Sequence, residues 1–364
     1  MKGLQQLINQ LCPNGVEWKT LGEVAKLERG VVISKEYLRD NAGVYPVYSS
    51  QTENNGEFGR INTYRYDGTY VTWTTDGAYA GTVFRRYGKF NITNVCGLIN
   101  ILDKDCIDVN YLYYILSITT KKYVNEGMGN PKLMSNVMAK VKIPLPPLAI
   151  QSRIVEILDH FTNLTANLTA ELALRRKQFE HFREKLLSLD GVPAVEWKTL
   201  GEVCEIKNGK DYKHLSEGSI PVWGTGGIMA YVDQFVYSKP SVLLPRKGSI
   251  DKIYYVEGPF WNIDTIFYTV INENVILPKY LYLYISTVDL TALDTSKGNR
   301  PSLTQSVLNK IQIPVPPLAV QQSIVAKLDK FTALIQNIEN ELALRQKQYE
   351  YYREKLLSFP SPSL

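Results

Sequence analysis

Few side chains in this sequence could support catalysis or bind a metal ion. The 364 residues include three histidines, His160, His181 and His214, and four cysteines, none of them in a C-x-x-C pair. Zinc sites and histidine-activated nucleophiles need several such groups close together. Residues 17–19 and 196–198 have the E-x-K form of a metal nuclease, but no upstream Pro-Asp carboxylate completes it. We therefore expect no catalytic residue and no metal site, and the structural role of a repeated strand edge explains both tripeptides better.

The composition is that of a cytoplasmic protein with two or three domains. The chain is longer than one ordinary hydrophobic core requires, and its formal charge is +5. The N-terminus lacks the apolar core of a signal peptide, and no run of eighteen apolar residues occurs. Four scattered cysteines are typical of reduced thiols in a reducing compartment. We expect no membrane association.

Two sequence repeats divide the chain into similar halves. The nine residues VEWKTLGEV at 16–24 return unchanged at 195–203, and 143–188 matches 313–358 without a gap at 29 of 46 positions. The segments between the repeats barely resemble one another. The pattern therefore predicts one framework that carries two different inserts. Leu7 and Ile8 precede the first copy as Leu186 and Leu187 precede the second, so the N-terminal segment resembles the last turns of a repeat helix.

The second repeat predicts two long helices. Each copy begins with a proline cluster, at 143–147 and 313–317, where a helix cannot continue, and no glycine or proline follows for about ten turns. Apolar residues then recur at seven-residue intervals in both copies, over about 55 Å of helix. We expect the copies to form an antiparallel coiled coil; the alternative is two separate amphipathic helices. The seam residues that we predict are Ile154, Leu158, Phe161, Leu168, Leu172, Phe179, Ile324, Leu328, Phe331, Ile338, Leu342 and Tyr349.

Arg175 and Arg345 interrupt the two seams at equivalent positions. A polar residue at such a position usually fixes the register of a coiled coil. The alternative is that each arginine binds a carboxylate of a partner. The helices carry nearly equal numbers of acidic and basic residues, so we do not expect them to bind phosphate along their length.

These patterns predict an α+β fold with two pseudo-symmetric halves. Each half is a mixed, β-rich domain followed by a long helix, because alternating aromatic and β-branched residues with glycine turns indicate strands in both inserts. The predicted domains are 1–142, with a short N-terminal helix, and 189–312. The predicted helical segments are 143–188 and 313–364. The first domain has seventeen basic and thirteen acidic residues and the second has twelve and thirteen, so any nucleic-acid surface must be local.

The repeated residues resemble one known family. The VEWKTLGEV motif, the IPLPPLA and IPVPPLA stops, and the helices that end in REKLL are similar to the specificity subunit of type I restriction-modification systems, over essentially the whole chain. The resemblance implies that each insert is a target-recognition domain and that the coiled coil sets the spacer of a bipartite, asymmetric DNA site. It also implies docking of two modification subunits, which bring S-adenosylmethionine and the methyltransferase chemistry, and of restriction subunits that join them. We expect this chain itself to be non-catalytic and to hold no cofactor.

If the inserts read DNA, polar hairpin tips are the candidate contacts. Arginine and lysine bind guanine edges or phosphates, asparagine binds adenine, and hydroxyl groups serve either role. The residues that we predict for the first insert are Trp73, Thr75, Tyr79, Arg85, Arg86 and Lys89, and for the second Arg246, Lys247, Ser249, Lys252, Trp261 and Asn262. Lys132 and Arg300, in matching glycine- and asparagine-rich loops, are predicted phosphate contacts. The alternatives are that these are solvated turns, and that the chain is a protein-interaction scaffold without DNA readout or a free-standing nuclease.

Overall fold

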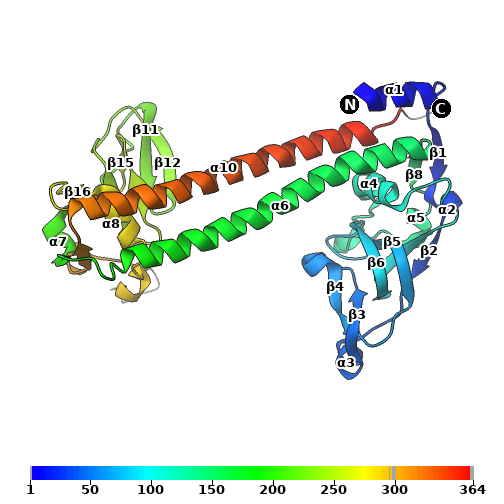
Figure 1. The fold of residues 1–364 in the computed structure, drawn as a ribbon, viewed down its shortest axis with the longest axis horizontal. Coiled ribbons are helices and arrows are strands. Elements are labelled where there is room, and N and C mark those ends of the chain that lie inside the picture. Colours follow the sequence, from blue (N-terminus) through cyan, green and yellow to red (C-terminus); the bar gives the residue numbers. More distant parts are fainter. Residues whose placement is uncertain (1, 295, 297–300, 361–364) are drawn as a thin grey trace. The chain divides into compact units, whose positions relative to one another are not determined.

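The computed structural model describes residues 2–294, 296 and 301–360, and its fold is α+β as expected. The chain divides into two compact units, Met1–Leu168 with Glu341–Leu364, and Thr169–Asn340. Each unit holds one β-rich domain and a part of each long helix (Figure 1). The units therefore differ from the predicted segments, because the helices are shared between them.

The first unit is built around a six-stranded sheet in the order β2-β7-β5-β6-β3-β4. Neighbouring strands are antiparallel except β3 and β6, which are parallel. The strands are β1 Glu17–Thr20, β2 Ala25–Arg29, β3 Ala42–Tyr48, β4 Glu57–Ile61, β5 Tyr66–Thr74, β6 Val83–Ile92, β7 Cys96–Ile101 and β8 Lys142–Leu145. The helices are α1 Lys2–Leu11, α2 Leu21–Val24, α3 Lys35–Asp40, η1 Glu53–Gly56, α4 Val109–Thr119, η2 Thr120–Tyr123, η3 Gly127–Gly129 and α5 Ser135–Met138.

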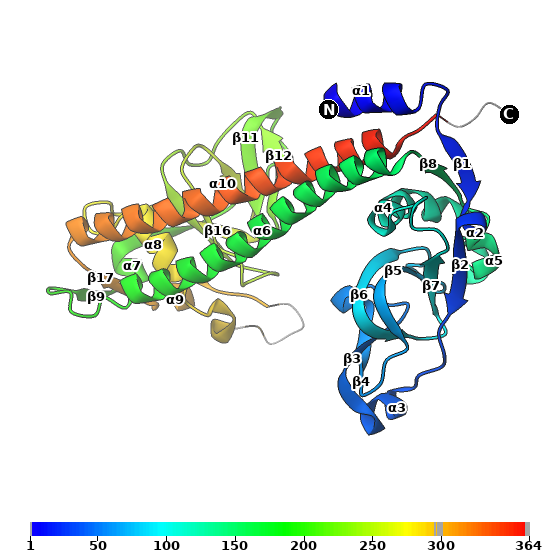
Figure 2. The same ribbon diagram turned by 45° about the vertical axis from the view of Figure 1, so that its right-hand side comes forward.

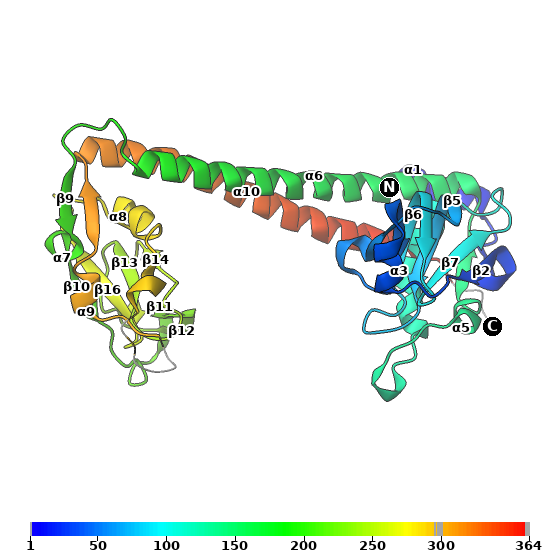
Figure 3. The ribbon, with the colours of Figure 1, turned by 90° about the horizontal axis from the view of Figure 1, so that it is seen from below.

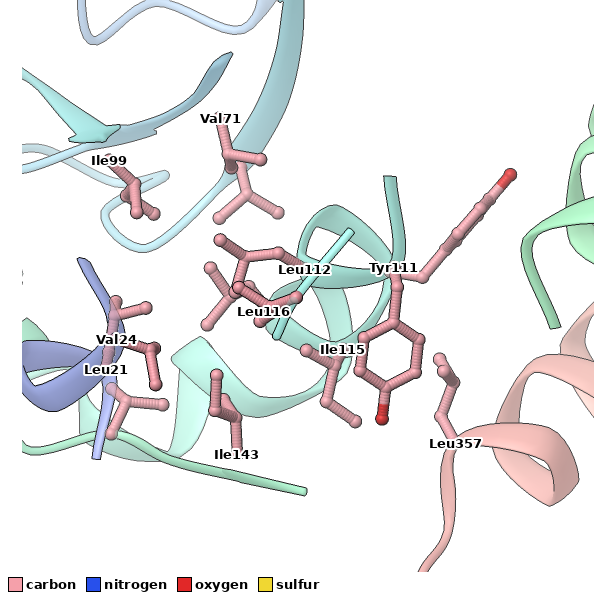
Figure 4. Packing of buried hydrophobic residues seen from close by; sticks show 14 of the residues in the cluster. Leu21, Val24, Val71, Ile99, Tyr111, Leu112, Ile115, Leu116, Ile143 and Leu357 are labelled. Carbon is pink, nitrogen blue, oxygen red and sulfur yellow. The ribbon is translucent and has the colours of Figure 1, made fainter. Parts of the chain in front are cut away.

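Both faces of the sheet are covered near the centre of β5. Val71 and Trp73 point to one face, where they join the residues of α4 in the main hydrophobic cluster, part of which Figure 4 shows. Thr72 points to the other face and is also fully buried. A β-carbon at Gly97 would lie 2.2 Å from the indole of Trp73, so only glycine fits at this position of β7. The strand is rich in β-branched and aromatic residues because every side chain at its centre must pack.

The second unit repeats the order of strands of the first, except that two short strands, β14 and β15, stand where the first unit has the long β6. Its sheets are β10-β16-β13-β14 and β12-β11-β15, and β11 pairs with β15 in parallel as β3 does with β6. The two inserts therefore share a strand arrangement that their sequences do not reveal. The strands are β9 Glu196–Thr199, β10 Cys204–Asn208, β11 Glu217–Gly224, β12 Gly227–Val232, β13 Ser241–Pro245, β14 Tyr254–Val256, β15 Trp261–Asn262, β16 Ile266–Ile271 and β17 Gln312–Val315. The helices are α7 Leu200–Val203, α8 Pro278–Ile285, η4 Leu290–Leu293 and α9 Gln305–Leu308.

The repeated nine-residue motif forms the same strand and helix start in both units. Strand β1 pairs with β8, and β9 pairs with β17, both antiparallel (Figure 2). Thr20 and Glu23 form a capping box at α2, and the equivalent pair forms one at α7, with 2.6 Å hydrogen bonds in each. The E-x-K residues pair with each other, since Lys19 lies 3.3 Å from Glu17 and the second copy does likewise. The E-x-K residues therefore have a structural role in these paired strands.

The long helices are α6, Leu148–Leu187, and α10, Leu318–Leu357, each 40 residues long and each starting directly after a proline pair. Within each unit a part of α6 lies beside a part of α10 (Figure 3). Phe161 stacks on Tyr352 at 5.3 Å in the first unit, and Phe182 stacks on Phe331 at 5.1 Å in the second. The two pairs are equally far apart on both helices but in opposite directions, which is an antiparallel register. All twelve predicted seam residues are buried or half-buried.

Arg175 and Arg345 are bound within their own helices. Arg175 contacts Glu171 and Gln178, and Arg345 contacts the equivalent glutamate and glutamine four residues before and three residues after it. Both arginines are half-buried. These bonds keep each guanidinium group in place beside the seam, and the role in register remains a prediction.

The N-terminal helix α1 packs against the end of α10. Leu4 is buried in the same cluster as Leu356 and Leu357, and the Trp18 indole nitrogen donates to the Pro360 carbonyl at 3.1 Å. This contact agrees with the resemblance of 4–11 to the last turns of a repeat helix. Among the described residues, no helix has the length and apolar character to span a bilayer.

Leu158→Ala and Leu328→Ala test the helix pairing in the two units. Both side chains are fully buried at equivalent positions, so each substitution leaves a cavity and should lower the free energy of unfolding by about 2–5 kcal/mol. Urea unfolding measures the loss. The control is Asn163→Ala, because the Asn163 side chain is exposed on α6, and this substitution should change stability little. A leucine variant as stable as this control would contradict the packing.

Candidate nucleic-acid interface

Two loops that are far apart in the sequence meet in each unit. In the first unit the Gly77 amide donates to the Pro131 carbonyl at 3.0 Å, and the Leu133 amide donates to the Thr75 carbonyl at 2.9 Å. In the second unit Gly248 donates to Pro301 at 3.0 Å and Leu303 to Arg246 at 2.9 Å. We call residues 75–81 with 129–133, and 246–252 with 301–303, the paired loops. Both predicted recognition tips are thus joined to the predicted phosphate-contact loops.

The first paired loops place one carboxylate between two cations. Asp76 lies 3.7 Å from Arg29 and 4.0 Å from Lys132. Lys132 is half exposed, and Tyr79, on the other loop of the pair, is 61% exposed. Arg29 was not predicted, because it lies on β2, far from these loops in the sequence. The arrangement offers the ammonium group of Lys132 and the phenol group of Tyr79 to a ligand, with part of the positive charge balanced by Asp76.

The second paired loops carry more exposed positive charge. Arg246 is half-buried over the Phe267 ring and donates to the Asp264 carbonyl at 3.1 Å. Lys247 lies 3.9 Å from the Asp264 carboxylate and is 53% exposed. Ser249 and Lys252 are exposed. Arg300 lies outside the described residues.

Two tryptophans and two polar residues predicted to contact DNA are buried instead, so these predictions are wrong. Trp73 is fully buried and its indole nitrogen donates to the Leu133 carbonyl at 2.9 Å, which holds the paired loops from inside. Thr75 is also fully buried, with its hydroxyl on Asp76. Trp261 is 7% exposed and donates to the Lys210 carbonyl at 3.0 Å, and Asn262 is buried with its amide on the Ile266 carbonyl. All four support the loops and cannot reach a duplex.

Of the two adjacent arginines of β6, Arg86 is also internal, so its prediction is wrong, whereas Arg85 is half-buried in an ion pair and its contact with DNA stays a prediction. Arg86 is 1% exposed, and burial lowers the pKa of its guanidinium group to about 10. Arg85 lies on the other face of the strand, 2.8 Å from the Asp159 carboxylate of α6 and over the ring of Tyr113. Lys89, further along the strand, is exposed, and a hydrogen bond with Tyr64 raises the pKa of its ammonium group.

Asp159 and Asp329 occupy equivalent positions on the two long helices, and each binds a cation of its insert domain. Asp159 accepts from Arg85 on strand β6, whereas Asp329 pairs with Lys279 on helix α8 at 3.3 Å. Tyr114 also donates its hydroxyl to Asp159. The framework therefore offers the same carboxylate in both halves, and each insert reaches it from a different element.

Among the described residues, no three histidine, cysteine, aspartate or glutamate side chains gather where they could hold a metal ion. The Cys96 and Cys204 thiols are buried, and burial raises the pKa of each to about 12. Such thiols are poor nucleophiles at neutral pH.

The family described as type I restriction modification DNA specificity domain matches the chain twice, over residues 13–174 and 194–344. The chain belongs to this family. Members of the family serve in DNA recognition rather than as enzymes. The two matched ranges coincide with the two halves that the repeats define, so each half of this specificity subunit carries one such domain.

Similar proteins support the assignment over the full length. A putative type I specificity subunit of Mycoplasma pneumoniae is 31% identical, covering 93% of this chain and 96% of that protein. The specificity subunit of the EcoR124I/EcoR124II restriction enzyme of Escherichia coli is 32% identical, covering 95% of each. The crystal structure of an S subunit from M. genitalium has the same fold, with a TM-score of 0.71 at 21% identity over 96% of this chain and 98% of that one.

Asp159→Asn and Asp329→Asn test the two helix attachments of the specificity subunit. Arg85 is only 17% exposed, so the first substitution leaves a largely buried cation without its charged partner and should cost about 1–3 kcal/mol of stability. Lys279 and Asp329 are 29% and 44% exposed, so the second should cost about 1 kcal/mol or less. Thermal or urea unfolding measures both. Equal losses of stability in the two variants would contradict the expectation that the more buried Arg85–Asp159 pair contributes more than the Lys279–Asp329 pair.

Proposed function

We propose that this specificity subunit selects the DNA sequence on which a type I restriction-modification complex acts. Its two insert domains read the two halves of a bipartite, asymmetric site in double-stranded DNA. The framework docks two modification subunits, which bind S-adenosylmethionine and carry out methylation, and restriction subunits join through them. The complex works on DNA in the cytoplasm. In this role the chain itself needs no catalytic group or cofactor.

The observation that carries this proposal is that each half matches the DNA specificity domain while the inserts differ. The two domains carry different accessible side chains. The first has the exposed Lys132 and Tyr79, and the second has the half-buried Arg246 and the exposed Lys247 and Lys252, which favours two different half-sites. A 40-residue helix is about 60 Å long, more than one DNA turn of about 34–36 Å. We propose that α6 and α10 set the number of unread base pairs between the half-sites.

Methylation mapping tests the proposal. The chain is expressed with its cognate modification subunits, and the modified bases are located in DNA of known sequence. We expect one bipartite motif, with Arg246→Ala relaxing only one half of it because the other domain is unchanged. A complex that methylates no bipartite sequence would contradict the proposal and favour a protein-interaction scaffold.

Lys132→Ala tests a phosphate contact in the first paired loops. A lysine that binds phosphate releases about one counterion, so its loss should weaken binding to all sequences alike and make the salt dependence of log K shallower by about 1. Lys132→Arg retains the charge and should keep the wild-type slope. Fluorescence anisotropy over a series of salt concentrations measures both. A change in the methylated motif with Lys132→Ala would show that the residue reads bases instead.

A further inference from the structure

The connection between β3 and β4, residues 49–56, ends in an unusual backbone conformation. Asn54 has φ 47° and Asn55 has φ 52°, and Gly56 follows with φ 76°, so three consecutive residues are left-handed. This region is unfavourable for residues with a β-carbon, although asparagine tolerates it better than most. Successive left-handed residues persist only where the surroundings hold them, and such strain gathers at functional sites.

The buried Arg86 side chain binds the backbone of this tip. Arg86 donates from Nη1 to the Asn55 carbonyl at 2.7 Å and from Nε to the Thr72 hydroxyl at 3.1 Å. Its guanidinium group lies between two aromatic rings, 3.6 Å from the centre of Tyr48 and 4.4 Å from that of Phe84. Burying a guanidinium ion costs free energy, and a surface turn without a further role does not need such an anchor.

The tip fits tightly onto this arginine. A β-carbon at residue 56 would lie 2.9 Å from Arg86 Nη2, so Gly56 is required both for its backbone angle and for the close approach. The Gly56 carbonyl also accepts from the Ser49 amide at 3.0 Å, which closes the connection. The backbone beneath the asparagines is therefore fixed at both ends.

The exposed side chains on the tip are suited to base edges rather than phosphates. Glu53, Asn54 and Asn55 are all exposed, and residues 49–56 contain no lysine or arginine. An asparagine amide accepts from adenine N6 and donates to adenine N7 in the major groove. A rigid backbone is what such a bidentate contact needs, because the two bonds form only if the amide is held at one angle.

The second unit anchors its equivalent hairpin differently. The β11–β12 tip, Gly224–Gly227, is held by the Tyr254 hydroxyl, which donates to the Thr225 carbonyl at 3.0 Å, and Tyr254 packs on Trp223. Three of its four residues are glycine and none is asparagine. Both inserts thus fix the tip of this hairpin through a backbone carbonyl, but only the first presents amide side chains on it.

Building on the function proposed above, we propose that Asn54 and Asn55 read adenine in the half-site of the first domain. In this proposal Arg86 is a positioning residue, which holds the tip without touching DNA. The tip is thereby the specificity-determining element of the first domain, and the paired loops supply contacts that are less dependent on sequence.

The test compares methylated motifs of the complete complex formed with the modification subunits. The Asn54→Gly/Asn55→Gly variant removes both amides, adds no charge and retains residues that adopt left-handed angles. We expect an A·T pair of one half-site to become degenerate and the affinity for the original duplex to fall about 10- to 100-fold. The other half-site, read by the second domain, should be unchanged.

Arg86→Met and Arg86→Lys test the positioning role. We expect Arg86→Met to relax the same base pair as the double variant, while Arg86→Lys keeps a donor near the Asn55 carbonyl and restores part of the selectivity. Melting curves of both variants show whether each is folded. A folded Arg86→Met protein that reads the wild-type motif unchanged, while the double variant does not, overturns the positioning role. Where the methionine variant does not fold, a folded Arg86→Lys protein that relaxes a different base pair from the double variant overturns it.

The controls separate this inference from the proposed function. A wild-type complex that methylates no bipartite sequence overturns the function itself. A wild-type bipartite motif that the double variant reads unchanged overturns only the assignment of the tip. Relaxation at a G·C pair, or in the half-site that Arg246→Ala affects, overturns the adenine contact.

Discussion

Each β-rich domain depends on both long helices to complete its hydrophobic core. In the first unit Ile154 and Leu158 of α6 share one cluster with Leu356 of α10. In the second, Leu187 of α6 shares a cluster with Leu328 of α10. The start of one helix and the end of the other are therefore buried together in each unit, which requires the helices to run in opposite directions. Loss of either helix would leave both cores open to water.

Much of this framework can be predicted from the sequence because its signals are periodic or local. Seven-residue spacing with proline stops predicted both helices, and the predicted seam residues are buried or half-buried. The repeated nine residues form a strand and a capping box whose contacts are only three residues apart. The strand order of the inserts could not be predicted, since pairing such as β3 with β6 joins segments whose sequences carry no shared pattern.

The binding residues were predicted less well because residue type does not show which way a side chain points. Trp73 and Trp261 have the chemistry of a nucleic-acid contact, yet both lie inside and hold loops through a single indole hydrogen bond. Arg86 and Lys89 lie three residues apart on β6, so their side chains point to opposite faces of the strand. Arg86 is buried and Lys89 is exposed. The left-handed backbone at Asn54 and Asn55 was not predicted either, although an N-N-G run is a signal for such a turn.

The equivalent aspartates Asp159 and Asp329 have a consequence for how such chains change over time. One accepts its cation from a strand and the other from a helix. The helix carboxylate can therefore pair with a cation from a strand or from a helix, so domains of different local structure can bind to it. A domain of different sequence can then join the same framework, provided that it brings a single cation within reach of the carboxylate and apolar residues to cover the helix ends.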